Sequence, residues 1–250
     1  MPSDLSWSPP PPQVKFTADD QVDIWGIPLD LPTSFLKLLE ATLSADEKDR
    51  AARFHFPADQ NRYIISHGSL RKILALYLHC EPDQLSFSVN DYGKPSLDQS
   101  RLEFNLSHSG DFALLAVTPA RKIGVDVEKM RAGISADIIG GHYFSKAEMA
   151  ELQALPLEQR EAAFFRCWTR KEAYIKAQGQ GLSLPLDSFD VSLTPDQTAI
   201  LRATRPDPAE AARWTLLSLP VPSGYEAAVA VQGKDLEIRL WDWKLPQEDR

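Results

Sequence analysis

The sequence predicts an α+β protein built from two related lobes of similar size. Helical and strand-like segments are grouped, rather than alternating one by one as in a parallel α/β protein. The two halves also share one layout, in which a capped short helix is followed by a longer helix and then by several short strands. The length of 250 residues suits two small domains, each able to bury a core.

The chain divides into three predicted segments. Residues 1–18 contain four consecutive prolines at residues 9–12, so we expect a flexible, extended arm there. Residues 19–125 form the predicted N-terminal α+β lobe, and residues 126–250 form the predicted C-terminal α+β lobe.

Capping signals and leucine spacing predict the helices of the first lobe. A first helix is expected after Pro32. Ser44 and Glu47 form a capping box, in which each side chain accepts a hydrogen bond from a free backbone amide, and this predicts a second helix. Asp59 is expected to cap a longer helix that reaches Cys80. Strands are predicted at residues 21–27, 85–89, 102–106, 112–117 and 123–127, with polar turns at residues 90–95 and 105–110.

The second lobe repeats this order. Ser145 and Glu148 form another capping box, and the helix that follows is expected to stop before Pro156. A longer helix is predicted over residues 158–178, because Gly179 is the residue type expected just past a helix end. Strands are predicted at residues 189–193, 200–203, 214–217, 227–231 and 236–241.

Composition argues against several classes of protein. The chain has 27 Lys and Arg against 35 Asp and Glu, and its net charge of −8 opposes general binding to nucleic acid or to anionic membranes. Its apolar runs are far shorter than the roughly 18 residues of a membrane-spanning helix. The N-terminus does not resemble a secretory signal, and two cysteines are too few for a disulfide framework. We therefore expect a cytoplasmic protein.

Asp126 and Glu128 are the first candidate pair for chemistry. They alternate with Val125 and Val127 on a predicted strand, which places both carboxylates on one face. A solvated strand face would have the same pattern. The functional alternative is a site for a hard cation, since Mg²⁺ binds one or two carboxylates and takes its other oxygens from water and substrate phosphates.

A second group lies along one face of the predicted long helix. Trp168, Glu172 and Lys176 are four residues apart and therefore stack on that face. An aromatic residue at the core edge beside an exposed Glu–Lys pair would look the same. As a functional group, Glu172 would supply a third carboxylate and Lys176 a positive charge, a set suited to metal-assisted chemistry on a diphosphate.

Polar loops and early basic residues offer contacts for phosphate. The Ser107 hydroxyl and the His108 ring can donate to phosphate oxygens, although an ordinary hairpin has the same residues. The loop at residues 93–95 lacks the spacing of a nucleotide P-loop. Basic residues on the early helices could form a local positive patch: Lys48, Arg50, Arg53, Arg62, Arg71 and Lys72.

Three separated motifs together resemble those of the 4′-phosphopantetheinyl transferases. They are Asn-Leu-Ser-His-Ser at 105–109, Ile-Gly-Val-Asp-Val-Glu at 123–128 and Trp-Thr-Arg-Lys-Glu-Ala-Tyr-Ile-Lys at 168–176; the segment 179–189 resembles the two-lobed surfactin-synthetase-activator (Sfp) type. That family transfers the phosphopantetheine arm of coenzyme A to a serine of an acyl or peptidyl carrier protein domain and releases adenosine 3′,5′-bisphosphate. The resemblance implies two lobes in a pseudo-two-fold arrangement within a monomer, with coenzyme A between them.

The resemblance also implies roles for individual residues. Asp126, Glu128 and Glu172 would hold Mg²⁺, or Mn²⁺, against the diphosphate of coenzyme A. Glu172 and Lys176 would be catalytic, Glu172 as acceptor of the serine proton and Lys176 as the partner of the diphosphate. The coenzyme A contacts would include Arg62 and His108 at the 3′-phosphate, and in full they are Lys48, Arg62, Gly93, Lys94, Pro95, Ser107, His108 and Lys176.

Two other functions use similar residues. A metal-dependent nuclease also clusters two acids and a lysine, but it usually places the second acid and the lysine two residues apart on a strand, and the net charge opposes DNA binding. A non-catalytic coenzyme A or carrier-domain binding module is the other alternative. The presence of all three acids and Lys176 argues against it.

Overall fold

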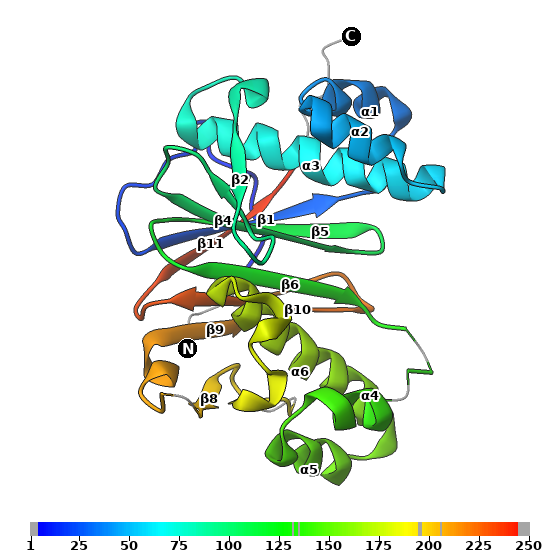
Figure 1. Ribbon diagram of the computed structural model, residues 1–250, viewed down its shortest axis with the longest axis vertical. Coiled ribbons are helices and arrows are strands. Elements are labelled where there is room, and N and C mark those ends of the chain that lie inside the picture. Colours follow the sequence, from blue (N-terminus) through cyan, green and yellow to red (C-terminus); the bar gives the residue numbers. More distant parts are fainter. Residues whose placement is uncertain (1–4, 132, 135, 195–196, 206, 245–250) are drawn as a thin grey trace.

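Two sheets pack face to face at the centre of the molecule, and helices cover their outer faces (Figure 1). The computed structural model describes residues 5–131, 133–134, 136–194, 197–205 and 207–244. The helices in that part of the chain are α1 (Thr33–Glu40), α2 (Ala45–Ala52), α3 (Pro57–Leu78), α4 (Ala136–Tyr143), α5 (Lys146–Ala154) and α6 (Leu157–Gln178). The strands are β1 (Gln21–Pro28), β2 (Phe87–Val89), β3 (Pro95–Leu97), β4 (Leu102–Ser109), β5 (Phe112–Pro119), β6 (Ile123–Lys129), β7 (Phe189–Val191), β8 (Leu201–Thr204), β9 (Trp214–Ser218), β10 (Tyr225–Gln232) and β11 (Glu237–Asp242).

The predicted signals at helix ends that involve only neighbouring residues are confirmed. Both capping boxes form, with the Ser44 and Ser145 hydroxyls accepting from the backbone amides of Glu47 and Glu148. Helix α6 ends at Gly179 in the left-handed conformation, at φ 70°, which glycine adopts without steric cost.

Three features of the two lobes differ from the sequence-based expectation. Asp59 lies inside the first turn of α3, and Phe56 occupies the capping position without a side-chain hydrogen bond. The predicted polar turn at residues 105–110 is mostly strand, because β4 pairs with β5 as far as Ser109. Helix α4 was not anticipated, since its short sequence carries neither a capping box nor a clear apolar period.

The first sheet combines strands from both ends of the chain. Its strands lie in the order β11-β1-β5-β4, and β11 pairs with β1 in parallel. The last strand of the chain is therefore part of the N-terminal sheet, which corrects its assignment to the C-terminal lobe. Hydrogen bonding between segments more than 200 residues apart decides this placement, and a local sequence pattern does not report it.

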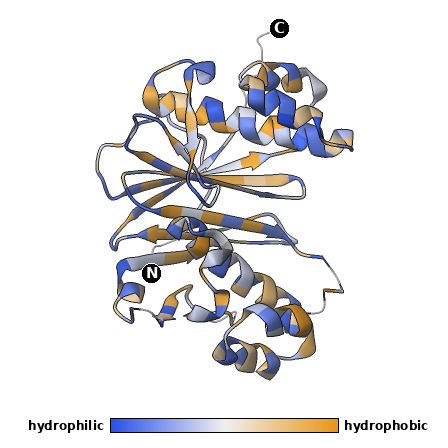
Figure 2. Cartoon of the chain, in the orientation of Figure 1, coloured by the Kyte–Doolittle hydropathy of each residue, from blue (hydrophilic) through white to orange (hydrophobic). Residues whose placement is uncertain are grey.

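The second sheet has the antiparallel order β6-β10-β9. Alternate residues of β10 divide its two faces: Ala227 and Val229 enter the core between the sheets, whereas Ala228 and Ala230 pack against α6. Figure 2 shows apolar residues concentrated on the strands between the helical layers, with hydrophilic residues frequent on the outer helices. No helix in the described ranges combines the length and apolar character needed to cross a membrane.

The N-terminal arm is extended, but residues 5–16 are packed rather than detached. Ser8 forms a parallel bridge with Trp241 of β11. The Trp7 indole donates to the carbonyl of Pro220 at 2.8 Å, and Phe16 stacks on Tyr77 with ring centroids 4.9 Å apart. The arm therefore covers the outer edge of β11, in contrast to the flexible tail expected from the proline run, because its large aromatic residues find apolar partners.

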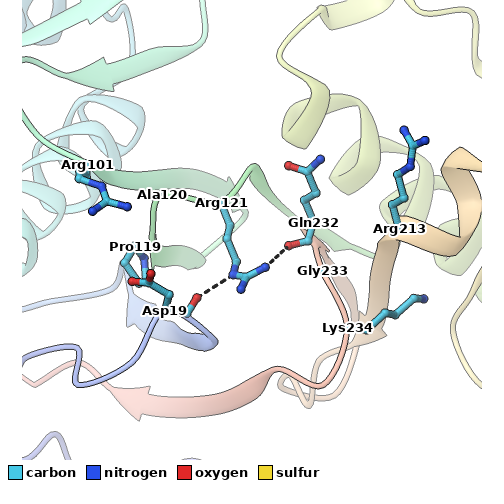
Figure 3. Close-up of a pocket in the computed structure, with 9 residues that line it drawn as sticks. All are labelled: Asp19, Arg101, Pro119, Ala120, Arg121, Arg213, Gln232, Gly233 and Lys234. Carbon is cyan, nitrogen blue, oxygen red and sulfur yellow. Dashed lines mark hydrogen bonds between the residues drawn. The ribbon is translucent and has the colours of Figure 1, made fainter.

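Arg121 ties the connection between the lobes to both sheets. Its side chain lies in a cavity of about 490 Å³ and donates to the carbonyl of Asp19 before β1 and to that of Gln232 at the end of β10 (Figure 3). Two other basic residues of this cavity, Arg213 and Lys234, point away from Arg121 (Figure 3). Arg121 therefore links the two sheets at this connection.

Candidate active site

Strand β6 directs Asp126 away from the core between the sheets and toward α6. Val125 and Val127 fill that core, so the alternation places Asp126 and Glu128 on the opposite face. Asp126 is only 3% exposed, which excludes a solvated strand face. Its Oδ1 accepts from Lys176 Nζ at 2.6 Å and from the Ser107 hydroxyl at 2.9 Å. Its Oδ2 is buried and has no hydrogen-bond partner among the described residues.

Gly124 allows α6 to lie directly on β6 beside these acids. A Cβ at this position would stand 2.2 Å from the carbonyl oxygen of Ala173 and 2.3 Å from the amide nitrogen of Ala177. Both atoms belong to the α6 backbone, which cannot be moved aside as a flexible side chain could. This close approach lets Glu172 and Lys176 reach the acids of β6, and it explains a glycine that the sequence analysis did not single out.

We expect Gly124→Ala to reduce both stability and the activity predicted from the sequence motifs. The added methyl group forces α6 away from β6, and overpacking of this kind costs about 1–3 kcal/mol. Chemical unfolding and a transfer assay measure the two effects. Gly141→Ala is the matched control, since no atom lies within 4 Å of its added Cβ and the change favours helix α4. Equal stability of Gly124→Ala and the parent protein would contradict this account.

The pKa values of two glutamates beside Asp126 are raised. Burial raises the pKa of Glu128, and the charge of Asp126 raises it further. Burial likewise raises the pKa of Glu172, with further contributions from Asp126 and Glu128. The two glutamates come from different elements, β6 and α6. A positive charge between them would relieve this repulsion, so the cluster favours a cation.

The donor set fits a hard divalent cation. It consists of carboxylate oxygens, the ligand type that Mg²⁺ prefers, and Asp126 Oδ2 is a buried oxygen with an unused acceptor site. No group of three His, Cys, Asp or Glu side chains in the described part of the chain is already arranged to hold a metal ion. Such a site would therefore need oxygens from the substrate as well, which is usual for Mg²⁺ bound with phosphates.

Basic side chains from both lobes flank the acids. Lys176 Nζ also lies 2.9 Å from the Ser107 hydroxyl. Partial burial lowers the pKa of His108, and the charges of Lys176 and Arg62 lower it further, which places these three groups in one electrostatic neighbourhood. Ser107 contacts Asp126 in this structure, an additional contact beside its predicted role toward phosphate.

A cavity of about 230 Å³ joins the two lobes next to the acids. It is lined on one side by Gly93, Lys94 and Pro95 and on the other by Glu172 and Lys176. Lys94 Nζ donates to the carbonyl of Ile123 at 3.0 Å, and burial lowers the pKa of this lysine. Residues predicted from separate motifs thus meet at one opening.

Two of the predicted contacts lie further out. Lys48 is exposed on α2, and the structure does not bring it to the cavity. The guanidinium of Arg62 bonds Asp111 at 2.8 Å and Asp59 at 3.0 Å. Hydrogen bonding to Arg62 and to Lys129 lowers the pKa of Asp111.

Sequence reasoning missed two residues of this region besides Gly124. Ser109 donates to Glu128, although the same motif supplied Ser107 and His108. Lys171, next to Glu172 in sequence, is fully buried and pairs with Glu148 at 2.8 Å. The helical period indicates that Lys171 and Lys176 lie on different faces of the helix. It does not identify Glu148 as the partner of Lys171.

Comparisons with known proteins agree with the predicted family. Residues 122–230 match the family model described as the 4′-phosphopantetheinyl transferase superfamily, and residues 32–120 match the model for the N-terminal part of 4′-phosphopantetheinyl transferase. The chain is 41% identical to 4′-phosphopantetheinyl transferase HetI of Nostoc sp. (strain PCC 7120) over 95% of this chain and 98% of that protein. It is also 31% identical to 4′-phosphopantetheinyl transferase Sfp of Bacillus subtilis (strain 168), over 85% and 93% of the two chains.

Proposed function

Since the chain belongs to the Sfp-type 4′-phosphopantetheinyl transferase family, we propose that the acids around Asp126 form its metal-assisted transfer site. The protein transfers 4′-phosphopantetheine from coenzyme A onto a serine of a carrier protein. This membership decides against the nuclease and against the non-catalytic binding module. The observation that carries the site assignment is Oδ2 of Asp126, which is buried and has no hydrogen-bond partner in the part of the chain that the structure describes.

Asp126, Glu128 and Glu172 are the proposed ligands of Mg²⁺, with Mn²⁺ as a substitute. The pKa values of Glu128 and Glu172, which burial and the charge of Asp126 raise, support this assignment, and all three proposed ligands are hard carboxylates. A bound Mg²⁺ would supply charge neutralisation on the diphosphate oxygens.

Lys176 and Glu172 are the proposed catalytic residues. The serine oxygen forms a bond to the phosphorus nearer the pantetheine, and the bond from that phosphorus to adenosine 3′,5′-bisphosphate breaks. Lys176 is placed to exchange its contact with Asp126 for a diphosphate oxygen and to stabilise the charge of the leaving phosphate. Glu172, which lines the same cavity, accepts the serine proton.

The remaining proposed coenzyme A contacts lie in the cavity and around it. Gly93, Lys94 and Pro95, which line the cavity, border the adenine nucleotide. Ser107, which contacts Lys176 and Asp126, lies at the phosphates. Arg62 and His108 bind the 3′-phosphate, a role that their shared electrostatic neighbourhood supports. Lys48 is the outermost proposed contact. We further propose a cytoplasmic monomer that does not bind nucleic acid, in keeping with two free cysteines and a net charge of −8.

Transfer onto an apo carrier domain tests the metal assignment. The protein is stripped with EDTA and mixed with coenzyme A and apo carrier, and the carrier mass is measured by mass spectrometry. We expect no mass increase without added metal, and a gain of one phosphopantetheine group after Mg²⁺ or Mn²⁺ is restored. Full transfer by the stripped protein, with residual metal excluded by elemental analysis, would overturn the assignment.

Asp111 competes with phosphate for Arg62, so its removal should strengthen coenzyme A binding. Asp111→Asn frees the guanidinium from a charged partner at 2.8 Å. Because exposed ion pairs contribute at most about 1 kcal/mol, we expect KM for coenzyme A to fall about 2- to 5-fold with kcat nearly unchanged. Steady-state kinetics measure this, with Arg62→Ala as the opposite control, expected to raise KM. An unchanged KM in Asp111→Asn would contradict the role of Arg62.

A further inference from the structure

Strand β4 presents three polar side chains, at every second residue, to strand β6 of the other sheet. Asn105 Oδ1 accepts from the amide of Val125 at 2.8 Å. The Ser107 hydroxyl donates to Asp126 at 2.9 Å, and the Ser109 hydroxyl donates to Glu128 at 2.8 Å. β4 and β6 are in separate sheets, so these side chains fix the register between the two lobes at the position of the acids.

The Ser109 hydroxyl is held in one orientation. The amide of Lys129 donates to Ser109 Oγ at 3.1 Å, which engages a lone pair of that oxygen and directs its proton toward Glu128 Oε2. Ser109 is 8% exposed, so water offers little competition for this bond. Glu128 has torsional freedom about its side-chain bonds, and the bond from Ser109 restricts that freedom.

We propose that Ser109 is a positioning residue that holds the Glu128 carboxylate in its metal-binding orientation. The inference rests on the proposed function of Glu128 as a metal ligand. Ser107 is joined to Lys176 as well as to Asp126, so its loss would disturb several groups. Ser109 acts on Glu128 alone among the acids. Loss of a partner that orients a metal ligand typically weakens metal affinity or activity by about 10- to 100-fold.

Mn²⁺ titration of the full chain with coenzyme A, without carrier, tests this role apart from turnover. Electron paramagnetic resonance measures free Mn²⁺, and hence the dissociation constant. We expect Ser109→Ala to raise that constant about 10-fold, and Ser109→Thr, which keeps the hydroxyl, to restore it. In the transfer assay, Ser109→Ala should need more Mg²⁺ for half-maximal rate and should recover most of its kcat at saturation.

Ser66→Ala is the matched control, because Ser66 is another buried serine and, among the described residues, its hydroxyl contacts only groups of α3, the Tyr63 carbonyl and His67 Nδ1. It should lose some stability and keep the parent Mn²⁺ affinity. If Ser109→Ala does not fold, as judged by circular dichroism, Ser109→Cys replaces it with a weaker donor of similar shape and should show the same weakening.

Two results would overturn the inference in distinguishable ways. Parent-like Mn²⁺ affinity in folded Ser109→Ala, together with lost affinity in Glu128→Ala, would leave Glu128 as a ligand and remove the role of Ser109. Parent-like affinity in Glu128→Ala would remove the ligand role of Glu128, and the inference about Ser109 would fail with it.

Discussion

Asp126→Asn is expected to abolish phosphopantetheine transfer while leaving the fold intact. Asparagine has nearly the same shape, but it removes the charge that faces Lys176 and the proposed metal. Because this carboxylate is buried and has a free oxygen, we expect kcat to fall by about 10³-fold or more. Glu128 and Glu172 do not replace the Asp126 carboxylate, because β6 directs that carboxylate toward α6.

The stability of this variant should change little. The substitution removes the ion pair between Asp126 and Lys176 at 2.6 Å. It also removes a negative charge that repels Glu128 and Glu172 and raises their pKa values. Lys176 is 28% exposed and keeps Glu172 one helical turn away, so we expect a net change within about 1 kcal/mol. Urea unfolding measures stability, and carrier mass measures transfer. Substantial turnover at saturating Mg²⁺ would exclude Asp126 from the metal site.

Lys171→Met is expected to destabilise the C-terminal lobe strongly. Lys171 is 0% exposed, and its ammonium group bonds Glu148 at 2.8 Å and the carbonyls of Leu186 and Phe189 at 2.7 Å. Removing it leaves the Glu148 charge buried without its partner, which typically costs about 3–5 kcal/mol. That is a large fraction of the roughly 5–15 kcal/mol that stabilises a folded domain.

Lys176→Met separates this structural role from catalysis. The same substitution five residues along α6 removes a lysine that is partly exposed, and the Asp126 carboxylate that it leaves behind keeps its bond from the Ser107 hydroxyl. Transfer should therefore be lost with a smaller loss of stability than in Lys171→Met, a loss that comes from the buried Asp126 charge without its ion-pair partner. Thermal and urea unfolding of both variants measure the contrast. The double variant Lys171→Met with Glu148→Gln should recover part of the lost stability, since no unpaired charge is then buried. A Lys171→Met protein as stable as the parent would contradict this reading of the buried pair.

The sequence predicted most of what depends on neighbouring residues. The capping boxes at Ser44 and Ser145 and the end of α6 at Gly179 form as expected, because a cap is satisfied by backbone groups within one turn. The alternation of Val125 and Val127 with the acids also holds, since the pleat of a strand has a period of two. The motifs further identified the family, because they preserve the order and spacing of several functional side chains.

Only the tertiary structure decided which distant segments meet. It placed β11 beside β1, brought α6 against Gly124, and set Ser109 on Glu128 and Lys171 on Glu148. These contacts depend on which packing of the whole chain buries the most apolar surface while satisfying its polar groups, and a short stretch of sequence does not encode that balance. The sequence by itself thus determined the two-lobed α+β class and the family, and it supplied the residues of the proposed site. The tertiary structure alone determined that the last strand belongs to the first sheet, and which residues hold the acids in place.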